Sequence, residues 1–361
     1  MRKTKLRIFV IAASIVLVSA CKKSNDTPNP MANYNSGQGI FITHEGDYGQ
    51  GNSSISFINP SNNTLINNVF TLVNNRPLGD VTQSMTIYNG IGYIVVNNSQ
   101  KVEVVNIADF RSTATVTTSN GITLKSPRYF LVIDSTKAYI SDWVDNNIKV
   151  INLSSLGFTK TITTGGGPEQ MAMVNGSVYV ANNGGLNTNS DSTVTVIDPT
   201  TDQVVTSIKV GYAPTAIKVD ANNMLWVMCS NYYDYTTNGY AGPGHLVKIN
   251  PSTNTVVATY AVVGNPERLA INKVGNVLYY EGAGVYKFNI TDTAATQTPL
   301  AAAPGVSGFY GVGVDPNNGN IYGAYAPTFT SAGQVYEYNS SGGSLANYTV
   351  GIGPAGFVFN Y

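Results

Sequence analysis

Side chains that commonly carry out catalysis are scarce in this sequence, and their spacing matches none of the common catalytic motifs. The chain has two histidines, His44 and His245, and two cysteines, Cys21 and Cys229. A zinc site needs three or four ligands, and no CxxC or HExxH pattern occurs. A triad hydrolase would need a histidine beside a serine in a GxSxG turn, which is also absent. The glycine-rich residues 164–167 precede a proline in a repeated turn, so we interpret them as a structural turn and not as a phosphate loop.

The sequence instead offers aromatic, amide and arginine side chains in turn-rich segments. Exposed Tyr and Trp beside Arg, Asn and Gln combine a large contact area with hydrogen-bond donors, as ligand sites do. Residues 230–245, for example, hold four tyrosines with Gly and Thr, and packing of such rings against neighbouring loops is the alternative to ligand binding. The candidate ligand-binding residues are Asp47, Tyr48, Asp80, Gln83, Arg128, Tyr129, Trp143, Asn183, Tyr232, Tyr233, Arg268, Tyr310 and Tyr325.

A repeated strand pattern must position these side chains. From about Gly39 to the end, apolar or alternating runs are separated by turn residues, and one run in each copy carries an aromatic residue. The seven aromatic markers are Phe41, Tyr93, Tyr139, Tyr179, Trp226, Tyr279 and Tyr322. By subtraction, successive markers are 40 to 53 residues apart, which is the spacing of four-stranded propeller blades. We therefore predict an all-β, seven-bladed β-propeller, with six or eight blades as alternatives because two copies are degenerate.

The two ends of the repeat region predict how the ring closes. The first copy starts at Ile40, inside its aromatic run, and lacks an innermost strand. Residues 353–360 repeat the innermost-strand pattern at the C-terminus. We expect this last strand to complete the first blade, which leaves only short and protected sheet edges.

Loop lengths indicate which face of the ring would bind a ligand. In a propeller, the loop between the second and third strands opens on the same face as the connection to the next blade. The long loops of this chain are all of the first kind, and they cover residues 44–52, 142–147, 182–192, 230–245 and 325–333. The candidate residues lie in these loops or in the connections between blades, so we expect one shared binding face.

Acidic residues on this face keep an enzyme open as the alternative. Some propellers hydrolyse lactones or esters with a central divalent metal held by Glu, Asp and Asn. The acids in suitable positions are Glu45, Asp80, Asp142, Glu169 and Glu267. Nothing in their spacing demands a metal, and solvated turn carboxylates would give the same pattern. We therefore assign no catalytic residue, no metal ligand and no cofactor.

The N-terminal residues predict export and lipid anchoring. Residues 1–20 have a basic start, an apolar middle and small residues at the end, which is typical of a signal peptide. Residues 18–21, Val-Ser-Ala-Cys, resemble the lipobox of bacterial lipoproteins, in which Cys21 becomes the lipidated first residue. A plain cleaved signal or a membrane anchor is the alternative. We expect a lipidated cysteine and flexible tether over residues 21–38, and the propeller over residues 39–361.

Charge and cysteine content indicate which binding partners and which disulfide bonds are not expected. Loss of the four basic residues in positions 1–20 leaves 16 of the 20 basic residues against 20 acidic ones, a formal charge of −4. Nucleic acid is not an expected partner, because its binding depends on clustered Lys and Arg. With Cys21 lipidated, only Cys229 remains, so no intramolecular disulfide is expected. The strand pattern around Cys229 predicts that its thiol is buried.

Two resemblances extend these expectations. Residues 179–182, Tyr-Val-Ala-Asn, together with residues 196–198 and 210–211, resemble the YVTN or YncE-like propeller family, over nearly the whole mature chain. Residues 39–56 and 78–85 resemble the opening of Bacteroidota surface propellers that include the cobalamin-capturing lipoprotein of an outer-membrane corrinoid transporter. This second resemblance implies a corrinoid on the loop face. His44 stands where those relatives commonly have Asn.

The sequence therefore predicts a non-enzymatic lipoprotein of the outer membrane, at the cell surface or in the periplasmic leaflet. Its expected partner is a small-molecule ligand, an outer-membrane transporter protein or another component of an envelope complex. A metal-dependent hydrolase or lyase is the alternative. We further expect that, among Trp143, Tyr232, Tyr233 and Arg128, at least one change to Ala weakens ligand binding by about 2 kcal/mol or more with little loss of stability.

Overall fold

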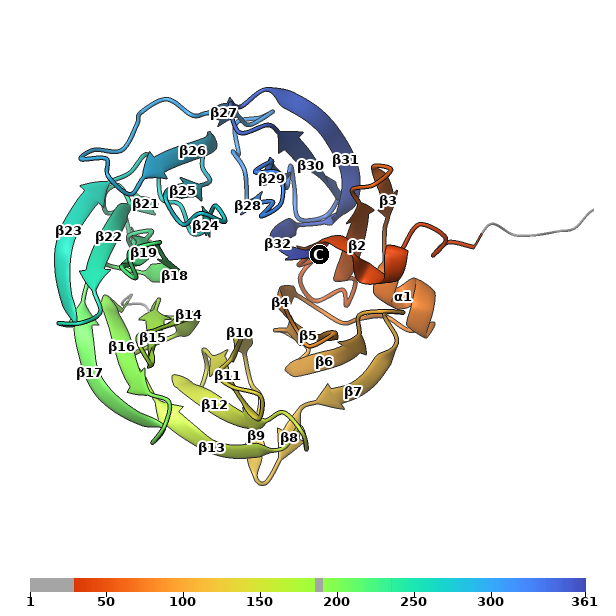
Figure 1. Cartoon of the computed structure of the whole chain (residues 1–361), viewed down its shortest axis with the longest axis horizontal. Coiled ribbons are helices and arrows are strands. Elements are labelled where there is room, and N and C mark those ends of the chain that lie inside the picture. The colour runs from red at the N-terminus through yellow and green to blue at the C-terminus, as the bar shows by residue number, and fades with distance from the viewer. Residues whose placement is uncertain (1–28, 186–190, 235) are drawn as a thin grey trace, which may run out of the picture.

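Seven antiparallel sheets of four strands surround a central axis in the computed structural model, which describes residues 29–185, 191–234 and 236–361 (Figure 1). The prediction of a seven-bladed, all-β propeller is confirmed. The predicted signal peptide, Cys21 and the first part of the tether lie outside the described residues, as do residues 186–190 and Tyr235 of the long loops. No helix of the described ranges is long and apolar enough to cross a membrane.

The blades follow one another along the chain, and in blades 2 to 7 the innermost strand comes first, whereas blade 1 takes its innermost strand from the C-terminus. Blade 1 consists of β32 (Pro354–Asn360), β1 (Gly39–His44), β2 (Ser54–Asn59) and β3 (Thr64–Ile66). Blade 2 consists of β4 (Thr82–Tyr88), β5 (Ile91–Val96), β6 (Lys101–Asn106) and β7 (Ser112–Val116). Blade 3 consists of β10 (Pro127–Val132), β11 (Lys137–Asp142), β12 (Asn147–Asn152) and β13 (Phe158–Thr163). Blade 4 consists of β14 (Pro168–Val174), β15 (Ser177–Asn182), β16 (Thr193–Asp198) and β17 (Gln203–Lys209).

The remaining blades keep this order. Blade 5 consists of β18 (Pro214–Val219), β19 (Leu225–Cys229), β22 (His245–Asn250) and β23 (Thr255–Ala261). Blade 6 consists of β24 (Leu269–Ile271), β25 (Val277–Tyr280), β26 (Gly284–Asn289) and β27 (Ala301–Ala302). Blade 7 consists of β28 (Gly311–Val314), β29 (Ile321–Tyr325), β30 (Ala332–Tyr338) and β31 (Ser344–Ile352). Two small hairpins pair β8 (Thr118–Ser119) with β9 (Ile122–Thr123) and β20 (Tyr233–Asp234) with β21 (Gly239–Tyr240).

The C-terminal strand closes the ring as the sequence predicts. β32 pairs with β1 in antiparallel register, with Ile40 opposite Phe359 and Phe41 opposite Val358. The backbone N–H of Gly356 also donates to Oγ1 of Thr43, 3.1 Å away. Strands from opposite ends of the chain therefore share one sheet, and β32 pairs the edge of β1 that would otherwise be open.

The seven marker aromatics lie in the second strand of each blade and pack between neighbouring sheets. All are buried, and the most exposed, Tyr93 and Tyr279, keep only 5% of their surface. Polar tips of these rings bond to residues in turns: Tyr179 donates to Asn254 Oδ1 of the next blade at 2.7 Å, and Trp226 Nε1 donates to Asp220 Oδ2 at 2.8 Å. The aromatic periodicity thus marks the core of the blades, where large rings contribute most of the buried area.

The propeller begins earlier than the sequence suggests. The predicted tether reaches residue 38, but Tyr34 is 4% exposed and packs against Phe41, Phe57 and Phe110. Its hydroxyl donates to the carbonyl of Ile107, 2.7 Å away. The single turn η1 (Asn35–Gly37) then leads into β1. One aromatic side chain is enough to fix the end of a polar segment, because its burial offsets the entropy of ordering a few residues.

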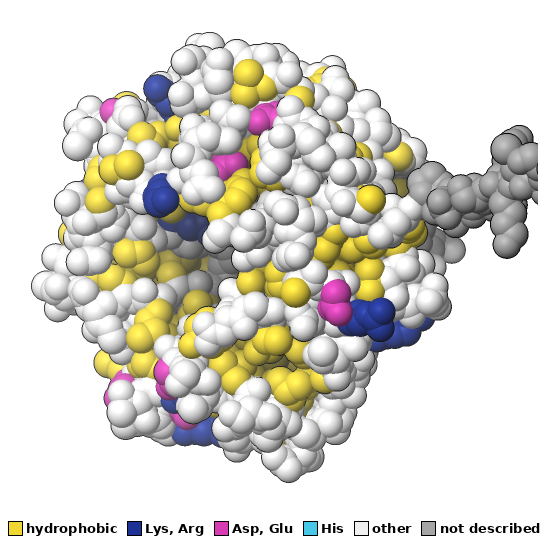
Figure 2. All heavy atoms as spheres, turned by 45° about the vertical axis from the view of Figure 1, so that its right-hand side comes forward, with side chains coloured by type: hydrophobic (Ala, Val, Ile, Leu, Met, Phe, Trp, Pro, Cys, Tyr) yellow, Lys and Arg dark blue, Asp and Glu magenta, His cyan; other side chains and the backbone are white. Residues whose placement is uncertain are grey.

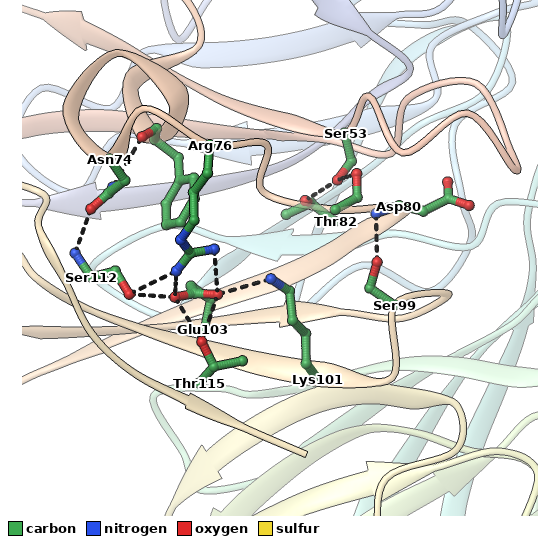
Figure 3. A network of polar contacts seen from close by, with 12 residues as sticks. Ser53, Asn74, Arg76, Asp80, Thr82, Ser99, Lys101, Glu103, Ser112 and Thr115 are labelled. Atoms are coloured by element: carbon green, nitrogen blue, oxygen red, sulfur yellow. Dashed lines mark hydrogen bonds and ion pairs between the residues drawn. The ribbon is translucent and has the colours of Figure 1, made fainter.

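The helix α1 (Val69–Asn74) joins blades 1 and 2, and an ion-pair network fixes the segment that follows it (Figure 3). Glu103 is fully buried and pairs with Arg76 at 2.5 Å and Lys101 at 2.9 Å. Ser112 Oγ donates to the same carboxylate at 2.5 Å. Burial alone would raise the pKa of Glu103, but the hydrogen bonds from Arg76, Ser112 and Lys101 outweigh it and hold the pKa below its usual value.

Candidate ligand-binding site

A central channel runs between the innermost strands. Its cavity of about 400 Å³ is lined by residues from all seven of these strands, β32, β4, β10, β14, β18, β24 and β28. The oblique space-filling view shows the middle of the ring hollowed, with hydrophobic side chains gathered around the hollow and few charged ones (Figure 2). The lining of the channel is therefore mixed: most of its residues are apolar, and Thr, Ser, Gln, Lys and Arg side chains supply polar groups.

A second cavity of about 540 Å³, which we call the loop-face pocket, lies among the loops. The loops between second and third strands of blades 1, 2, 3 and 7 contribute to it, as do the connections before β4, β10, β24 and β28. The two sets of loops therefore share one face, as expected. Six of the thirteen candidate residues line this pocket: Tyr48, Gln83, Arg128, Trp143, Arg268 and Tyr310.

Arg128 organises one side of the loop-face pocket. Its guanidinium carbon lies 3.8 Å from the centroid of the Trp143 ring, a cation–π contact. Its Nη2 and Nε donate to Glu169 Oε1 at 2.7 and 3.0 Å, and its Nη1 donates to Gln83 Oε1 at 2.5 Å. Burial acts to lower the pKa of Arg128, but the Glu169 carboxylate outweighs it and raises the pKa above its usual value. The cation is thus fixed in place and permanently charged.

Three buried polar atoms of this cluster have no hydrogen-bond partner among the described residues. They are Nε1 of Trp143, Nε2 of Gln83 and Oε2 of Glu169. A buried polar group without a partner costs about 1–3 kcal/mol, and functional sites are among the places where such groups are kept. The cluster therefore has hydrogen-bonding capacity that the protein does not use internally.

Arg268 organises the opposite side of the pocket. Its Nη2 lies 3.6 Å from Glu45 Oε1, and its guanidinium carbon lies 5.7 Å from the centroid of the Tyr310 ring. The hydroxyl of Tyr310 donates to Glu45 Oε2 at 2.9 Å, and the ring meets Phe329 edge-on at 5.0 Å. These contacts join blades 1, 6 and 7 at the rim of the channel. The Arg268 ion pair is the longer of the two in the pocket.

The other candidate residues do not join this pocket. Tyr129 lines the central channel, and Asn183 and Tyr233 line a third cavity of about 410 Å³ beside blade 5. Tyr232 packs edge-on against Tyr212, with 5.1 Å between ring centroids. Tyr232 therefore follows the alternative given above, in which loop rings pack against neighbouring loops.

Three further candidates are structural or peripheral. The Asp80 carboxylate accepts from the Gly49 N–H at 2.8 Å and from Asn98 Nδ2 at 2.6 Å, which joins the loops of blades 1 and 2. Tyr325 is half-buried in the core between blades 6 and 7. Asp47 is half-buried and hydrogen-bonds through its backbone N–H to Asn52.

Four of the five acidic residues considered for a metal, Glu45, Asp80, Asp142 and Glu169, have other partners. Glu45 and Glu169 pair with arginines, and Asp142 accepts the N–H groups of Lys125 and Ser126 at 2.8 and 3.1 Å. Within the described part of the chain, no three His, Cys, Asp or Glu side chains are grouped closely enough to hold a metal ion.

The predicted burial of Cys229 is confirmed, and burial raises the pKa of its thiol.

Lys218 is the functional candidate that the sequence analysis missed. It extends from β18 into the central channel, where the lining is otherwise largely apolar. Burial lowers its pKa to about 8. The signal was a lysine within an innermost strand, opposite the marker Trp226, at the position where the other blades carry small, apolar or hydroxyl residues: Val358, Thr86, Leu131, Ala172, Ala270 and Gly313.

This arrangement defines a class: a closed seven-bladed β-propeller whose channel opens into an aromatic and arginine-lined pocket on the loop face. The chain belongs to the family described as "Domain of unknown function (DUF5074)", whose model matches residues 38–360. No curated protein matches the chain significantly.

Solved structures with the same fold come from several bacteria. A quinonprotein alcohol dehydrogenase-like protein from Bacteroides thetaiotaomicron is similar with a TM-score of 0.67 and 15% identity, over 91% of this chain and 80% of that one. A putative 6-phosphogluconolactonase from Bacteroides fragilis is similar with a TM-score of 0.63 and 12% identity, over 90% and 98%. Hydrazine synthase of Kuenenia stuttgartiensis has a TM-score of 0.56 and 14% identity, over 74% and 86%. At these identities the likeness shows the fold alone.

Proposed function

We propose that this protein is a non-enzymatic lipoprotein of the cell envelope that captures a small, partly polar molecule in the loop-face pocket. The observation that carries the proposal is the stacking of Arg128 on Trp143 in a pocket of about 540 Å³, beside buried polar atoms without internal partners. Ligand pockets have volumes of about 300–1,000 Å³ and combine aromatic walls with a few fixed polar groups.

The rim of the pocket supports binding more than catalysis. Tyr48 is 72% exposed and Phe329 is 45% exposed, and both line the pocket. Large exposed rings at the edge of a concave surface offer contact area to a ligand with little loss of side-chain entropy. The two arginines are engaged with carboxylates and are not arranged around a nucleophile or a general base.

Cobalamin is the first ligand to test, because residues 39–56 and 78–85 resemble the opening of cobalamin-capturing surface propellers. His44 stands where those propellers commonly have Asn, and this difference does not weaken the reason for testing cobalamin. The His44 side chain is fully buried beside Ser54 and is not part of the pocket lining. Delivery of the ligand to an outer-membrane transporter and anchoring through Cys21 complete the proposal.

Calorimetry tests the binding role. We expect cobalamin, or failing it a glycan or siderophore, to bind, and Trp143→Ala to weaken binding by about 2 kcal/mol or more, as removal of a hot-spot aromatic does. Tyr212→Ala is the matched control, because Tyr212 is 51% exposed and lies outside the pocket lining. No binding of any of these at about 1 mM would overturn small-molecule capture and leave docking of an envelope protein or enzymatic activity.

Membrane fractionation tests the anchor separately. We expect the full gene product to partition into membranes and Cys21→Ala to lose that partitioning, since stable anchoring of a polar domain requires acyl chains. Equal membrane retention of both proteins would overturn the lipoprotein role without affecting the binding site.

A further inference from the structure

The charged side chains that line the central channel are of one sign. Lys218 and Arg268 contribute to its wall, and no Asp or Glu of the described residues does. Most of the remaining lining is apolar, from residues such as Met85, Leu131 and Phe357. Arg268 has Glu45 as its partner at 3.6 Å, whereas Lys218 has no carboxylate partner among the described residues, which is unusual because desolvation of a charge is normally offset by a partner.

Lys218 is half-buried and lacks the carboxylate partner that the half-buried Lys101 and the buried Lys149 have. Lys101 pairs with Glu103 at 2.9 Å, and Lys149 pairs with Asp145. The nearest hydrogen-bond acceptor of Lys218 Nζ is Gln170 Oε1 at 3.5 Å, and no Asp or Glu oxygen of the described residues lies within 4.0 Å. The ammonium group is therefore desolvated by the channel wall and only weakly hydrogen-bonded.

Two other donors lie at the boundary between the channel and the loop-face pocket. Arg268 and Gln83 are the residues that line both cavities. The ion pair of Arg268 with Glu45 is long, at 3.6 Å, and Nε2 of Gln83 has no partner among the described residues. A group that passes from the pocket into the channel would meet both donors before Lys218.

We propose that the central channel is an oxyanion-binding site, in which a carboxylate or phosphate group pairs with Lys218 below Arg268. An anion there supplies the counter-charge that the channel lacks, and charge-assisted hydrogen bonds of this kind are the strong ones. The proposal deepens the proposed function by giving the captured ligand an acidic group. Anion binding itself is tested without that ligand.

The groups that surround Lys218 determine its pH response. Titratable and charged side chains on the packed elements and turns are Tyr129, Glu169, Lys248, Glu267, Arg268 and Glu281. Glu169 is engaged by Arg128, and Glu281 accepts the backbone N–H groups of Glu267 and Arg268 at 2.6 and 2.9 Å. Burial raises the pKa of Glu281 to about 7, whereas it lowers that of Lys218 to about 8. Variants of Lys218 itself are therefore needed to assign any pH effect.

Thermal melts with inorganic phosphate, acetate or chloride at matched ionic strength test the site. At about pH 7, where Lys218 is charged, we expect phosphate to stabilise the protein saturably and more than chloride does. At about pH 9.5 the half-saturating phosphate concentration should rise about tenfold or more, because the neutral amine no longer attracts an anion. An equal response to acetate would indicate a general oxyanion site, and a response to phosphate alone would indicate a phosphate site.

Variants test whether the phosphate effect depends on Lys218. Lys218→Met should abolish the phosphate effect, Lys218→Arg should retain it at both pH values, and Lys287→Met is the matched control on an exposed strand position. Trp143→Ala should keep it, because Trp143 lines only the loop-face pocket, so a failed binding role and a failed anion site are distinguishable. The same stabilisation in Lys218→Met, or the same pH dependence in Lys218→Arg as in the natural protein, would overturn the proposal.

Discussion

Arg128 and Trp143 form a stacked pair across the loop face, with the guanidinium carbon 3.8 Å from the centroid of the indole ring. Arg128 belongs to the start of β10, and Trp143 follows β11 of the same blade. Glu169 at the start of β14 holds the other edge of the guanidinium. A contact between two adjacent blades therefore fixes the orientation of the aromatic wall of the pocket.

This relationship revises the expectation that Arg128 can be replaced without loss of stability. Arg128→Ala leaves the Glu169 carboxylate buried without a counter-charge, so we expect a loss of about 3–5 kcal/mol in the free energy of unfolding. The double variant Arg128→Met with Glu169→Met should regain much of that loss, because an apolar pair removes both charges. Urea unfolding measures the free energy of unfolding of both variants. If Arg128→Ala were as stable as the natural protein, the ion pair between Arg128 and Glu169 would be contradicted.

The network at Glu103 predicts different costs for two arginines. Arg76→Ala removes one cation from a fully buried carboxylate and should cost about 1–3 kcal/mol. Arg111→Ala is the matched control, because Arg111 and its partner Asp109 are 76% and 49% exposed, and it should change stability by about 0.5 kcal/mol or less. Similar melting temperatures for the two variants would show that Lys101 alone neutralises Glu103.

Removal of residues 355–361 should destabilise the protein far more than trimming a free tail. The deletion removes nearly all of β32 and exposes the edge of β1. We expect the melting temperature to fall by at least about 10 °C, or cooperative unfolding to be lost. Deletion of Tyr361 alone, which removes only its bond to Asp315 Oδ2, is the control. Equal melts for the long deletion and the natural protein would mean that the ring does not depend on its closing strand.

His44 predicts a loss of stability in acid. Burial lowers the pKa of His44 to about 4, from an ordinary value of 6.5. As pH falls from about 6.5 to 4, the unfolded chain takes up a proton that the folded protein does not, so stability decreases by up to about 3 kcal/mol. His44→Asn should lack this part of the decrease. The measurement is the free energy of unfolding of the natural protein and of His44→Asn between about pH 6.5 and 4. Parallel curves for the two proteins would show that His44 does not cause the loss of stability.

The fold was predictable because it is repeated along the chain. The aromatic markers and alternating runs recur at nearly constant spacing, and the missing first strand matched the extra last strand. The helix α1 was not predictable in the same way. Its sequence, Val-Phe-Thr-Leu-Val-Asn, has β-branched residues with poor helix propensity, and the asparagines at its two ends adopt left-handed backbone angles with φ of 56° and 52°.

The site was only partly predictable, since its contacts join distant parts of the sequence. Arg128 and Glu169 are 41 residues apart, and Tyr310 and Glu45 are 265 residues apart. Loop position correctly placed Tyr48, Trp143 and the arginines on one face. It did not reveal which rings pack against each other, as Tyr232 does on Tyr212, because that depends on loop conformations that a single sequence does not specify.

The closing strand also sets an order for folding during synthesis. The side chain of Asn360 donates to the carbonyl of Gly37 across 323 positions, so the first blade stays incomplete until Pro354–Asn360 has been synthesised. Blades 2 to 7 are local in sequence and can form as they emerge, whereas blade 1 must wait with an unpaired edge. A chain of this design is exposed to misassembly at the edge of β1 throughout the synthesis of blades 2 to 7, until β32 is available to pair with it.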